Sequence, residues 1–226
     1  MTRVLIIEDH RVVAQGLELG LRAEGFEVDS TDGNPDALPA ALAAAPPDIV
    51  LLDLYLAGGR SGITLMPMLQ APGRTVIVLT GATDPTILAR ALDAGANAVL
   101  GKAMPFEQLV REILAIREGR TVEADRRNFQ VRREARAAEE QRARSLAPFA
   151  ALTRREEQVL AMLLDGVQAA DIAERSYVSL ATVRSQIRSI LTKLGVGSQL
   201  TAVSMAIKAG WAPGDAGRSH TGMPPS

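Results

Sequence analysis

Apolar and polar positions alternate in blocks along the first 116 residues, which form five repeats of a strand pattern followed by a helical pattern. Short apolar runs separated by amphipathic stretches are typical of a parallel sheet with crossover helices. The pattern predicts strands near 3–8, 26–30, 48–53, 74–80 and 97–101, and helices near 11–24, 36–45, 61–70, 85–94 and 105–117. We therefore expect a five-stranded, doubly wound α/β domain in this part of the chain.

Local signals define some ends of these helices. Asp84 followed by Pro85 predicts a helix start, with the aspartate as N-cap and the proline at the first helical position. Gly95 is expected to end the same helix. Pro39 and Pro67 fall inside the second and third helical patterns, so those two helices should be shortened or kinked.

The pattern changes after residue 118. Residues 119–150 are rich in Arg, Glu and Ala and contain few large apolar residues, which favours an exposed charged helix. Two interpretations remain open: a solvated helical linker, which we prefer, and a dimerisation helix. Phe129, Val131 and Leu146 are too widely spaced to define a heptad repeat.

From Leu152 onward the pattern is entirely helical. Thr153 and Glu156 have the spacing of a capping box, and Gly166 is expected to end the helix that they begin. Further helices are predicted near 168–175, from Ser179 to about Leu194, and from Ser198 to about Ala209. A short helix, a turn and a longer helix form the helix-turn-helix arrangement. Residues 212–226 are rich in Gly, Pro and Ser and are expected to be a disordered tail.

Composition narrows the classes of function. The chain has no cysteine, which excludes disulfides, cysteine metal ligands and a cysteine nucleophile, and which fits an intracellular protein. No apolar stretch reaches the ~20 residues of a membrane helix. The N-terminus also lacks the pattern of a signal peptide. We therefore expect a cytoplasmic protein that does not use a membrane as a partner.

Charge is distributed unevenly along the chain. Residues 1–116 carry 8 basic and 14 acidic side chains, residues 117–151 carry 9 and 6, and residues 152–226 carry 8 and 6. An acidic first half and a mildly basic second half indicate different partners for the two ends.

Chemically useful side chains stand where the predicted strands end. These residues are Glu8 and Asp9, Asp53, Thr80 and Lys102. The carboxyl ends of parallel strands meet at one edge of the sheet, so the groups should converge there. Carboxylates suit Mg²⁺, a lysine places positive charge on phosphoryl oxygens, and a threonine hydroxyl donates a hydrogen bond. The sequence therefore predicts a site that holds a divalent cation and receives a phosphoryl group.

With this spacing, residues 1–118 resemble the receiver domain of two-component response regulators. The resemblance implies that Asp53 accepts a phosphoryl group from a sensor histidine kinase. It also implies a set of ligands for Mg²⁺, namely Glu8, Asp9, Asp53 and the Tyr55 carbonyl. Thr80 and Lys102 would then contact the phosphoryl group.

Three positions depart from the receiver pattern. Val99 stands where receivers usually carry an aromatic residue that follows the movement of the threonine. Its presence predicts weak coupling between phosphorylation and output. The turn after Asp53 contains Leu56-Ala57-Gly58-Gly59 in place of a Met-Pro-Gly type turn, and Ala103 replaces the proline that usually follows the lysine.

Residues 151–211 resemble the LuxR-type helix-turn-helix domain, and together with the receiver they resemble the NarL/FixJ group of transcription regulators. The motifs that carry the resemblance are Leu152-Thr153-Arg154-Arg155-Glu156, Asp171-Ile172-Ala173, Thr182-Val183-Arg184 and Ile190-Leu191-Thr192-Lys193-Leu194-Gly195-Val196. We expect residues 119–150 to be a charged helical linker between the two domains. The fold class is then an α/β receiver, a helical linker and an all-α DNA-binding domain.

The helix predicted from Ser179 has an apolar face and a polar face, as expected of a helix that enters the major groove. Arg184 and Arg188 lie one turn apart and can reach guanine edges or phosphates. The predicted DNA-binding residues are Thr182, Arg184, Ser185, Arg188 and Lys193.

Some residues common in the LuxR family are absent. Ala169-Ala170 stands where a basic or amide pair is frequent, and Gln186 replaces a frequent histidine. Modest DNA affinity is therefore expected, with more dependence on dimerisation. Trp211 is the only tryptophan and is expected to close the core of the last helix.

These observations predict a phosphorylation-dependent transcription regulator, not an enzyme, that binds double-stranded promoter DNA as a homodimer, with RNA polymerase as a further partner. The alternative is a degenerate receiver that dimerises without phosphorylation; Val99 favours it, and the intact Asp53, Thr80 and Lys102 oppose it.

A Mg²⁺-dependent phosphohydrolase is a third hypothesis. Such enzymes need a second acid two residues after the nucleophile, and Tyr55 occupies that position. His10 and His220 are too isolated to form a metal pair.

Overall fold

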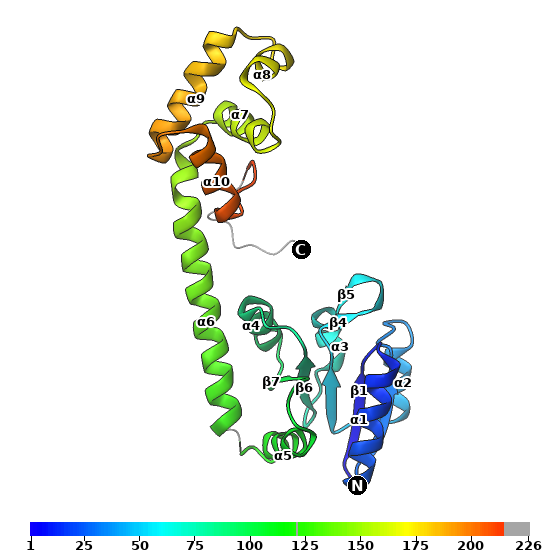
Figure 1. The fold of residues 1–226 in the computed structure, drawn as a ribbon. Helices are drawn as coiled ribbons and strands as arrows, with labels where there is room; N and C mark the ends of the chain where they lie inside the picture. Colours follow the sequence, from blue (N-terminus) through cyan, green and yellow to red (C-terminus); the bar gives the residue numbers. More distant parts are fainter. Residues whose placement is uncertain (121, 215–226) are drawn as a thin grey trace. The chain divides into compact units, whose positions relative to one another are not determined.

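The computed structural model describes residues 1–120 and 122–214. The chain divides into two compact units, residues 1–138 and residues 139–226. Figure 1 shows an α/β arrangement in the first unit and helices alone in the second. The predicted tail lies outside the described residues from 215 onward, and so does His220.

The first unit is built on a parallel sheet of five strands. These are β1 (Arg3–Ile7), β2 (Glu27–Thr31), β3 (Ile49–Leu52), β6 (Thr75–Thr80) and β7 (Ala98–Gly101). Their order in the sheet is β2-β1-β3-β6-β7, which leaves β2 and β7 at the edges. Every predicted strand is therefore present, within one or two residues of its expected ends, and the doubly wound α/β fold is confirmed.

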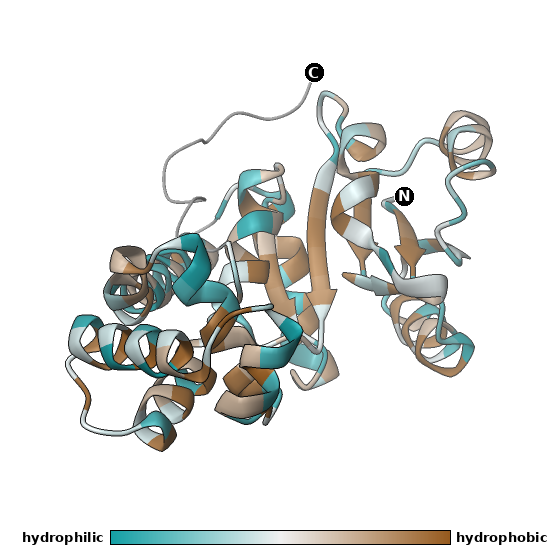
Figure 2. Cartoon of the chain, turned by 90° about the horizontal axis from the view of Figure 1, so that it is seen from above, coloured by the Kyte–Doolittle hydropathy of each residue, from teal (hydrophilic) through white to brown (hydrophobic). Residues whose placement is uncertain are grey.

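Alternate strand residues enter two separate cores. In β1, Val4 and Ile6 pack with α1 (Arg11–Ala23) and α5 (Phe106–Arg117). Leu5 and Ile7 point to the opposite face, which is covered by α2 (Leu38–Ala44), α3 (Met66–Leu69) and α4 (Pro85–Asp93). Figure 2 shows the central strands as hydrophobic along most of their length, and every residue of β3 and β6 is buried, as expected for strands covered on both faces.

The two prolines shorten their helices, as predicted. Pro39 lies in the first turn of α2, so that helix begins at Leu38 and has 7 residues. Pro67 lies in the first turn of α3, which has 4 residues and follows a 3₁₀ turn, η2 (Gly62–Leu65). Proline is tolerated in a first turn because the amide that it lacks would have no helical partner there.

The prediction that an α-helix begins near residue 61 is wrong, because α3 begins at Met66. A small hairpin precedes η2, formed by β4 (Tyr55–Leu56) and β5 (Arg60–Ser61) around a 3₁₀ turn, η1 (Ala57–Gly59). Gly58 and Gly59 both have positive φ, 73° and 72°. Glycine adopts this conformation without a Cβ clash, so the two glycines allow the hairpin, which extends to Ser61, the first residue of the predicted helix.

The second unit contains α7 (Arg154–Leu164), α8 (Ala169–Arg175), α9 (Leu180–Leu194) and α10 (Gln199–Ala209), after a 3₁₀ turn, η3 (Ala147–Ala151). The capping box between Thr153 and Glu156 is formed, and Ser179 and Ser198 cap α9 and α10. Trp211 is buried and stacks on Phe149 with ring centroids 5.5 Å apart, which supports its expected packing role.

A single 25-residue helix, α6 (Val122–Leu146), occupies most of the predicted linker. Three of its residues, Ala124, Val131 and Ala135, are buried against the first unit. The first half of α6 is therefore packed rather than solvated on all sides, and neither interpretation of the linker anticipated this.

Among the described residues, no single helix has the length and apolar character needed to cross a membrane. The pair α9 and α10, bent by 56°, passes that test only when the two are taken together.

Candidate phosphoryl and DNA-binding sites

The carboxyl edge of the sheet gathers the predicted acidic residues. Glu8 follows β1 and is hydrogen-bonded through its amide to the Thr31 carbonyl, at 3.0 Å. Asp53 follows β3, and its amide donates to the Ile7 carbonyl at 2.9 Å. The sheet ladder therefore continues up to both carboxylates, and both side chains are buried, with exposed fractions of 2% and 4%.

Lys102 joins the two acidic positions. Its ammonium Nζ lies 2.7 Å from Asp53 Oδ2 and 2.5 Å from Glu8 Oε2. Burial alone would lower the pKa of Lys102, but hydrogen bonds and charge attraction from Asp53 and Glu8 outweigh it and raise that pKa. Lys102 therefore stays positively charged beside Asp53, where it can neutralise an incoming anion.

Thr80 also lies at this edge of the sheet. It is the last residue of β6, it is buried, and its carbonyl accepts the amide hydrogen of Lys102 at 3.0 Å. The Thr80 hydroxyl accepts a hydrogen bond from the amide of Ala82 at 3.2 Å. A Cβ built on Gly81 would meet no heavy atom within 4 Å apart from its chain neighbours, so the space at this position is open.

One glycine is required by close approach to the acceptor residue. A Cβ on Gly62 would lie 2.0 Å from the carbonyl oxygen of Asp53, a distance that only a backbone shift could relieve. The Gly62 amide also donates to the Leu54 carbonyl at 2.9 Å. Gly62 therefore holds the start of η2 against the chain that carries Asp53.

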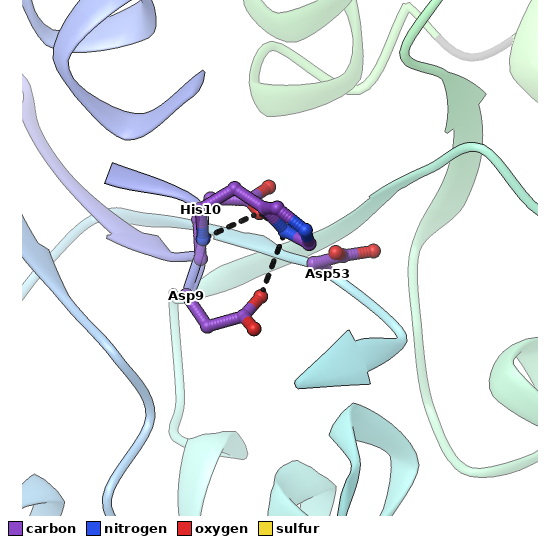
Figure 3. Close-up of side chains that lie close together, drawn as sticks. Asp9, His10 and Asp53 are labelled. Carbon is purple, nitrogen blue, oxygen red and sulfur yellow. Dashed lines mark hydrogen bonds and ion pairs between the residues drawn. The ribbon is translucent and has the colours of Figure 1, made fainter. Parts of the chain in front are cut away.

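The donor groups fit a divalent cation. One ligand atom from each of Glu8, Asp9, His10 and Asp53 lies within 4.8 Å of the others. Figure 3 shows Asp9 and His10 gathered beside Asp53. Asp9 Oδ1 is buried, and its one polar contact among the described residues is the ion pair with His10 Nδ1, at 3.0 Å. Three carboxylates suit Mg²⁺, which would neutralise charge in this cluster.

His10 also belongs to this cluster, although the sequence had indicated that it was too isolated to form a metal pair with His220. Its Nδ1 lies 3.0 Å from Glu8 Oε1 and 3.0 Å from Asp9 Oδ1. The hydrogen bond to Glu8 and the charges of Asp9 and Glu8 raise the pKa of His10. Its place directly after Asp9 was the available signal, because a residue that follows a strand end shares the same edge.

The helix-turn-helix presents the predicted polar face. In α9, Val183, Ile187, Ile190 and Leu194 are buried. Arg184, Ser185 and Arg188 are exposed, and with Leu180 and Ala181 they line a shallow hollow of about 320 Å³. The hydroxyl of Ser179 accepts the Thr182 amide hydrogen at 3.1 Å and fixes the start of this helix.

Comparison with known families matches both parts of the chain. The model of the response regulator receiver domain matches residues 4–114, and that of the bacterial regulatory proteins of the luxR family matches residues 150–206. The chain is a response regulator of the NarL/FixJ group.

Two similar proteins span nearly the whole of this response regulator. The oxygen regulatory protein NreC of Staphylococcus aureus is 29% identical over 210 residues, covering 91% of this chain and 97% of that protein. RcsB from Salmonella enterica serovar Typhimurium, bound to promoter rprA with the phosphomimetic BeF₃⁻, is 24% identical with a TM-score of 0.50. That comparison covers 90% of this chain and 97% of RcsB, and shows a shared fold.

In this response regulator Lys193 has a partner inside its own domain. Its Nζ lies 2.6 Å from Glu156 Oε2, and Glu156 also accepts hydrogen bonds from Ser189 and Thr153. The lysine is therefore engaged in joining α9 to the start of α7. We do not include it in the proposed DNA surface.

Tyr177 is a residue that sequence reasoning missed. It lies in the turn between α8 and α9, has a positive φ of 53°, and is 97% exposed. A tyrosine in this backbone region is strained, because its Cβ crowds the following carbonyl. The available signal was an aromatic residue in a turn that leads into α9.

Proposed function

We propose that this response regulator accepts a phosphoryl group on Asp53 from a sensor histidine kinase and thereby controls how residues 151–211 bind promoter DNA. The observation that carries the proposal is the ion pair between Lys102 and Asp53, 2.7 Å apart, at an edge that also contains Thr80. In the same chain, the two exposed arginines of α9 provide a surface for DNA.

The geometry supports phosphoryl transfer to Asp53. A carboxylate oxygen of Asp53 attacks the phosphorus, the new P–O bond forms, and the bond to the donor nitrogen breaks. Lys102 is already charged beside the acceptor, and Thr80, the last residue of β6, brings to the same edge a hydroxyl that would donate to a phosphoryl oxygen. Glu8, Asp9, Asp53 and the Tyr55 carbonyl would hold Mg²⁺, which supplies further charge neutralisation when bound.

We propose that DNA is contacted by Thr182, Arg184, Ser185 and Arg188 on α9 and by Tyr177 in the preceding turn. In a helix-turn-helix the second helix enters the major groove while the first crosses the backbone. A turn between them lies near the phosphates. We infer that the exposed Tyr177 donates its hydroxyl hydrogen to one of them.

We propose a homodimer as the active form, acting in the cytoplasm with RNA polymerase as a further partner. On α10, Leu200 and Ile207 lie two turns apart and are 80% and 65% exposed. Large apolar side chains on one stripe of an exposed helix favour contact with another protein surface. A second copy would place two reading helices on paired half-sites.

The test of the proposal begins with a chemical phosphodonor. Acetyl phosphate with Mg²⁺ should add one phosphoryl group, measured by intact mass, as an acid-stable and base-labile adduct. Asp53→Asn should abolish it, whereas Asp36→Asn, a change at an exposed aspartate of the same unit, should not. An adduct that persists in Asp53→Asn would overturn the assignment.

The same samples test the alternative of a phosphorylation-independent dimeriser. The buried Val99, in place of an aromatic, is the observation that favours it. If phosphorylated wild type and Asp53→Asn bind promoter DNA with equal affinity in gel-shift titrations, the receiver works without phosphate and the alternative is correct.

A further inference from the structure

His10 stands between the phosphoryl site and the first turn of α1. It is the N-cap residue of that helix, but its side chain makes no capping hydrogen bond. The imidazole turns instead to the carboxyl edge of the sheet, where Figure 3 shows it beside Asp9 and Asp53. Its side chain is 67% exposed, whereas that of Asp53 is 4% exposed. The ring therefore lies on the solvent side of a buried acidic cluster.

Three contacts hold the histidine among the carboxylates. His10 Nδ1 lies 3.0 Å from Glu8 Oε1 and 3.0 Å from Asp9 Oδ1. The backbone amide of His10 also donates to Glu8 Oε1, at 3.1 Å, and this fixes that oxygen on the histidine side. Lys102 contacts the other oxygen of Glu8. The lysine and the histidine therefore share the Glu8 carboxylate without competing for one oxygen atom.

These distances match those between neighbouring ligands of one cation. In an octahedral site with bonds of about 2.1 Å, adjacent ligand atoms lie about 3.0 Å apart and opposite ones about 4.2 Å apart. One ligand atom from each of Glu8, Asp9, His10 and Asp53 lies within 4.8 Å of the others. Four donors are thus gathered at a spacing close to that of a coordination sphere. A cation bound here takes the place of the hydrogen between His10 Nδ1 and Glu8 Oε1.

The imidazole changes which cation suits the cluster. Carboxylate oxygens alone suit a hard cation such as Mg²⁺, which binds oxygen ligands and keeps several waters. An imidazole nitrogen is a softer donor, and first-row transition cations gain more from it than Mg²⁺ does. Glu8, Asp9 and Asp53 together with His10 combine both types of donor. This set should bind transition cations more tightly, relative to Mg²⁺, than the three carboxylates would alone.

We propose that His10 is a protein ligand of the cation at the phosphoryl site, and that its nitrogen raises the affinity of this site for first-row transition cations relative to Mg²⁺. The inference rests on the proposed phosphoryl chemistry, which it deepens by specifying the class of cation. The carboxylates supply the negative charge that attracts any divalent cation, and His10 supplies the discrimination between cations.

The first arm of the test compares two cations in calorimetric titrations without a phosphodonor. His10→Ala should weaken Co²⁺ binding by about tenfold or more, because a ligand is lost, and should weaken Mg²⁺ binding far less. A histidine that acted only as a charged neighbour of the carboxylates would change both affinities by the same factor, and that result would overturn the inference.

Arg11→Ala is the matched control for this arm. Arg11 is the next residue along the chain, it is exposed, and it carries a basic side chain that is not a metal ligand. Its removal should change the Co²⁺ and Mg²⁺ affinities by the same factor. A change confined to Co²⁺ in Arg11→Ala would remove the special role of His10.

The second arm detects the nitrogen directly. His10 and His220 are the two histidines of the chain, so His220→Ala in a protein without a histidine tag leaves one imidazole. Pulsed electron paramagnetic resonance of Mn²⁺ bound to this variant should show hyperfine coupling to nitrogen. The coupling should change when the chain carries isotopically labelled histidine. Bound Mn²⁺ without such coupling would show that His10 is not a ligand.

The outcomes separate this inference from the proposed function. If Mn²⁺ binds without nitrogen coupling and acetyl phosphate with Mg²⁺ modifies Asp53, the inference is wrong and the proposed function stands. If the coupling is present and Asp53 is not modified, the cation site stands and the phosphoryl assignment fails. If no divalent cation binds to the wild-type chain, the proposed metal site and the inference fail together.

Discussion

Glu156 at the start of α7 and Lys193 near the end of α9 form an ion pair, with Nζ 2.6 Å from Oε2, although 37 residues separate them. The same carboxylate accepts hydrogen bonds from Ser189 and from the capping-box partner Thr153. One buried side chain therefore caps the start of α7 and also fixes α9, the helix proposed to read DNA.

This pair predicts acid sensitivity of the DNA-binding unit. Burial would raise the pKa of Glu156, but hydrogen bonds from Lys193, Ser189 and Thr153 lower it from 4.5 to about 2. Because the folded pKa is the lower one, the stabilisation is complete above pH 4.5 and is lost as the pH falls from there towards 2. Trp211, buried in this unit, should report the loss in fluorescence melts at a series of pH values.

The matching variant is Glu156→Gln, which leaves Lys193 without its charge partner. It should destabilise the unit by about 1–3 kcal/mol at neutral pH and flatten the acid dependence. Glu174→Gln, at an exposed position of α8, is the control and should change neither. An unchanged acid profile in Glu156→Gln would assign the sensitivity to other groups.

A second prediction concerns the metal. Glu8, Asp9 and Asp53 bring three carboxylates together beside one ammonium, so their mutual repulsion should fall when a cation binds. Millimolar Mg²⁺ should raise the melting temperature of the receiver. Asp9→Asn should reduce that rise, and Asp36→Asn should leave it intact. A thermal scan without any Mg²⁺ response would contradict the proposed site.

A third prediction separates base reading from phosphate contact on α9. Arg188→Ala should cost about 1–3 kcal/mol per half-site and relax preference at one position if Arg188 contacts a base. If it contacts only phosphate, binding should weaken on all sequences and the salt slope should flatten by roughly one unit per contact. Gel-shift titrations on operator and scrambled DNA at several salt concentrations distinguish the two.

The control for this experiment is Arg136→Ala, at an exposed arginine of α6. It should retain wild-type affinity on both DNAs. Normal binding by the double variant Arg184→Ala/Arg188→Ala would show that α9 is not the reading helix.

A fourth prediction uses the strain at Tyr177. Tyr177→Gly should relieve a backbone conformation that costs about 1 kcal/mol, so the folded domain should be as stable as wild type or more so. The same change should weaken DNA binding on all sequences, because it removes the proposed phosphate contact. Salt dependence should stay the same, since the lost side chain is neutral. Fluorescence melts and gel shifts on the same samples measure both, and undiminished DNA binding would remove Tyr177 from the interface.

A fifth prediction concerns the core under α6. Val99→Phe, which restores an aromatic residue at this position, should overpack the cluster shared with Val131 and destabilise the receiver by about 1–3 kcal/mol. Adding Val131→Ala should recover part of the loss by making room. Calorimetric melts provide the measurement, with Val12→Phe at an exposed position of α1 as the control. A neutral Val99→Phe would mean that α6 leaves this face open.

The sequence by itself determined the strand–helix alternation, the capping residues of α7, α9 and α10, and the meeting of Glu8, Asp53, Thr80 and Lys102. These follow from local rules, since side-chain periodicity, caps and the common edge of parallel strands need no knowledge of distant contacts. The turn glycines Gly58 and Gly59 were visible, but their hairpin was not predicted, because a helix pattern continued beyond them.

Only the tertiary structure decided the roles of His10, Lys193 and α6. Lys193 had a polar helical position typical of DNA contact, and its partner Glu156 becomes a neighbour only when α7 packs on α9. The first half of α6 has only small or isolated apolar residues, so no periodic stripe marked it as a packed helix. Ala124, Val131 and Ala135 are buried because the β7 edge is there to receive them, and a sequence pattern does not contain that surface.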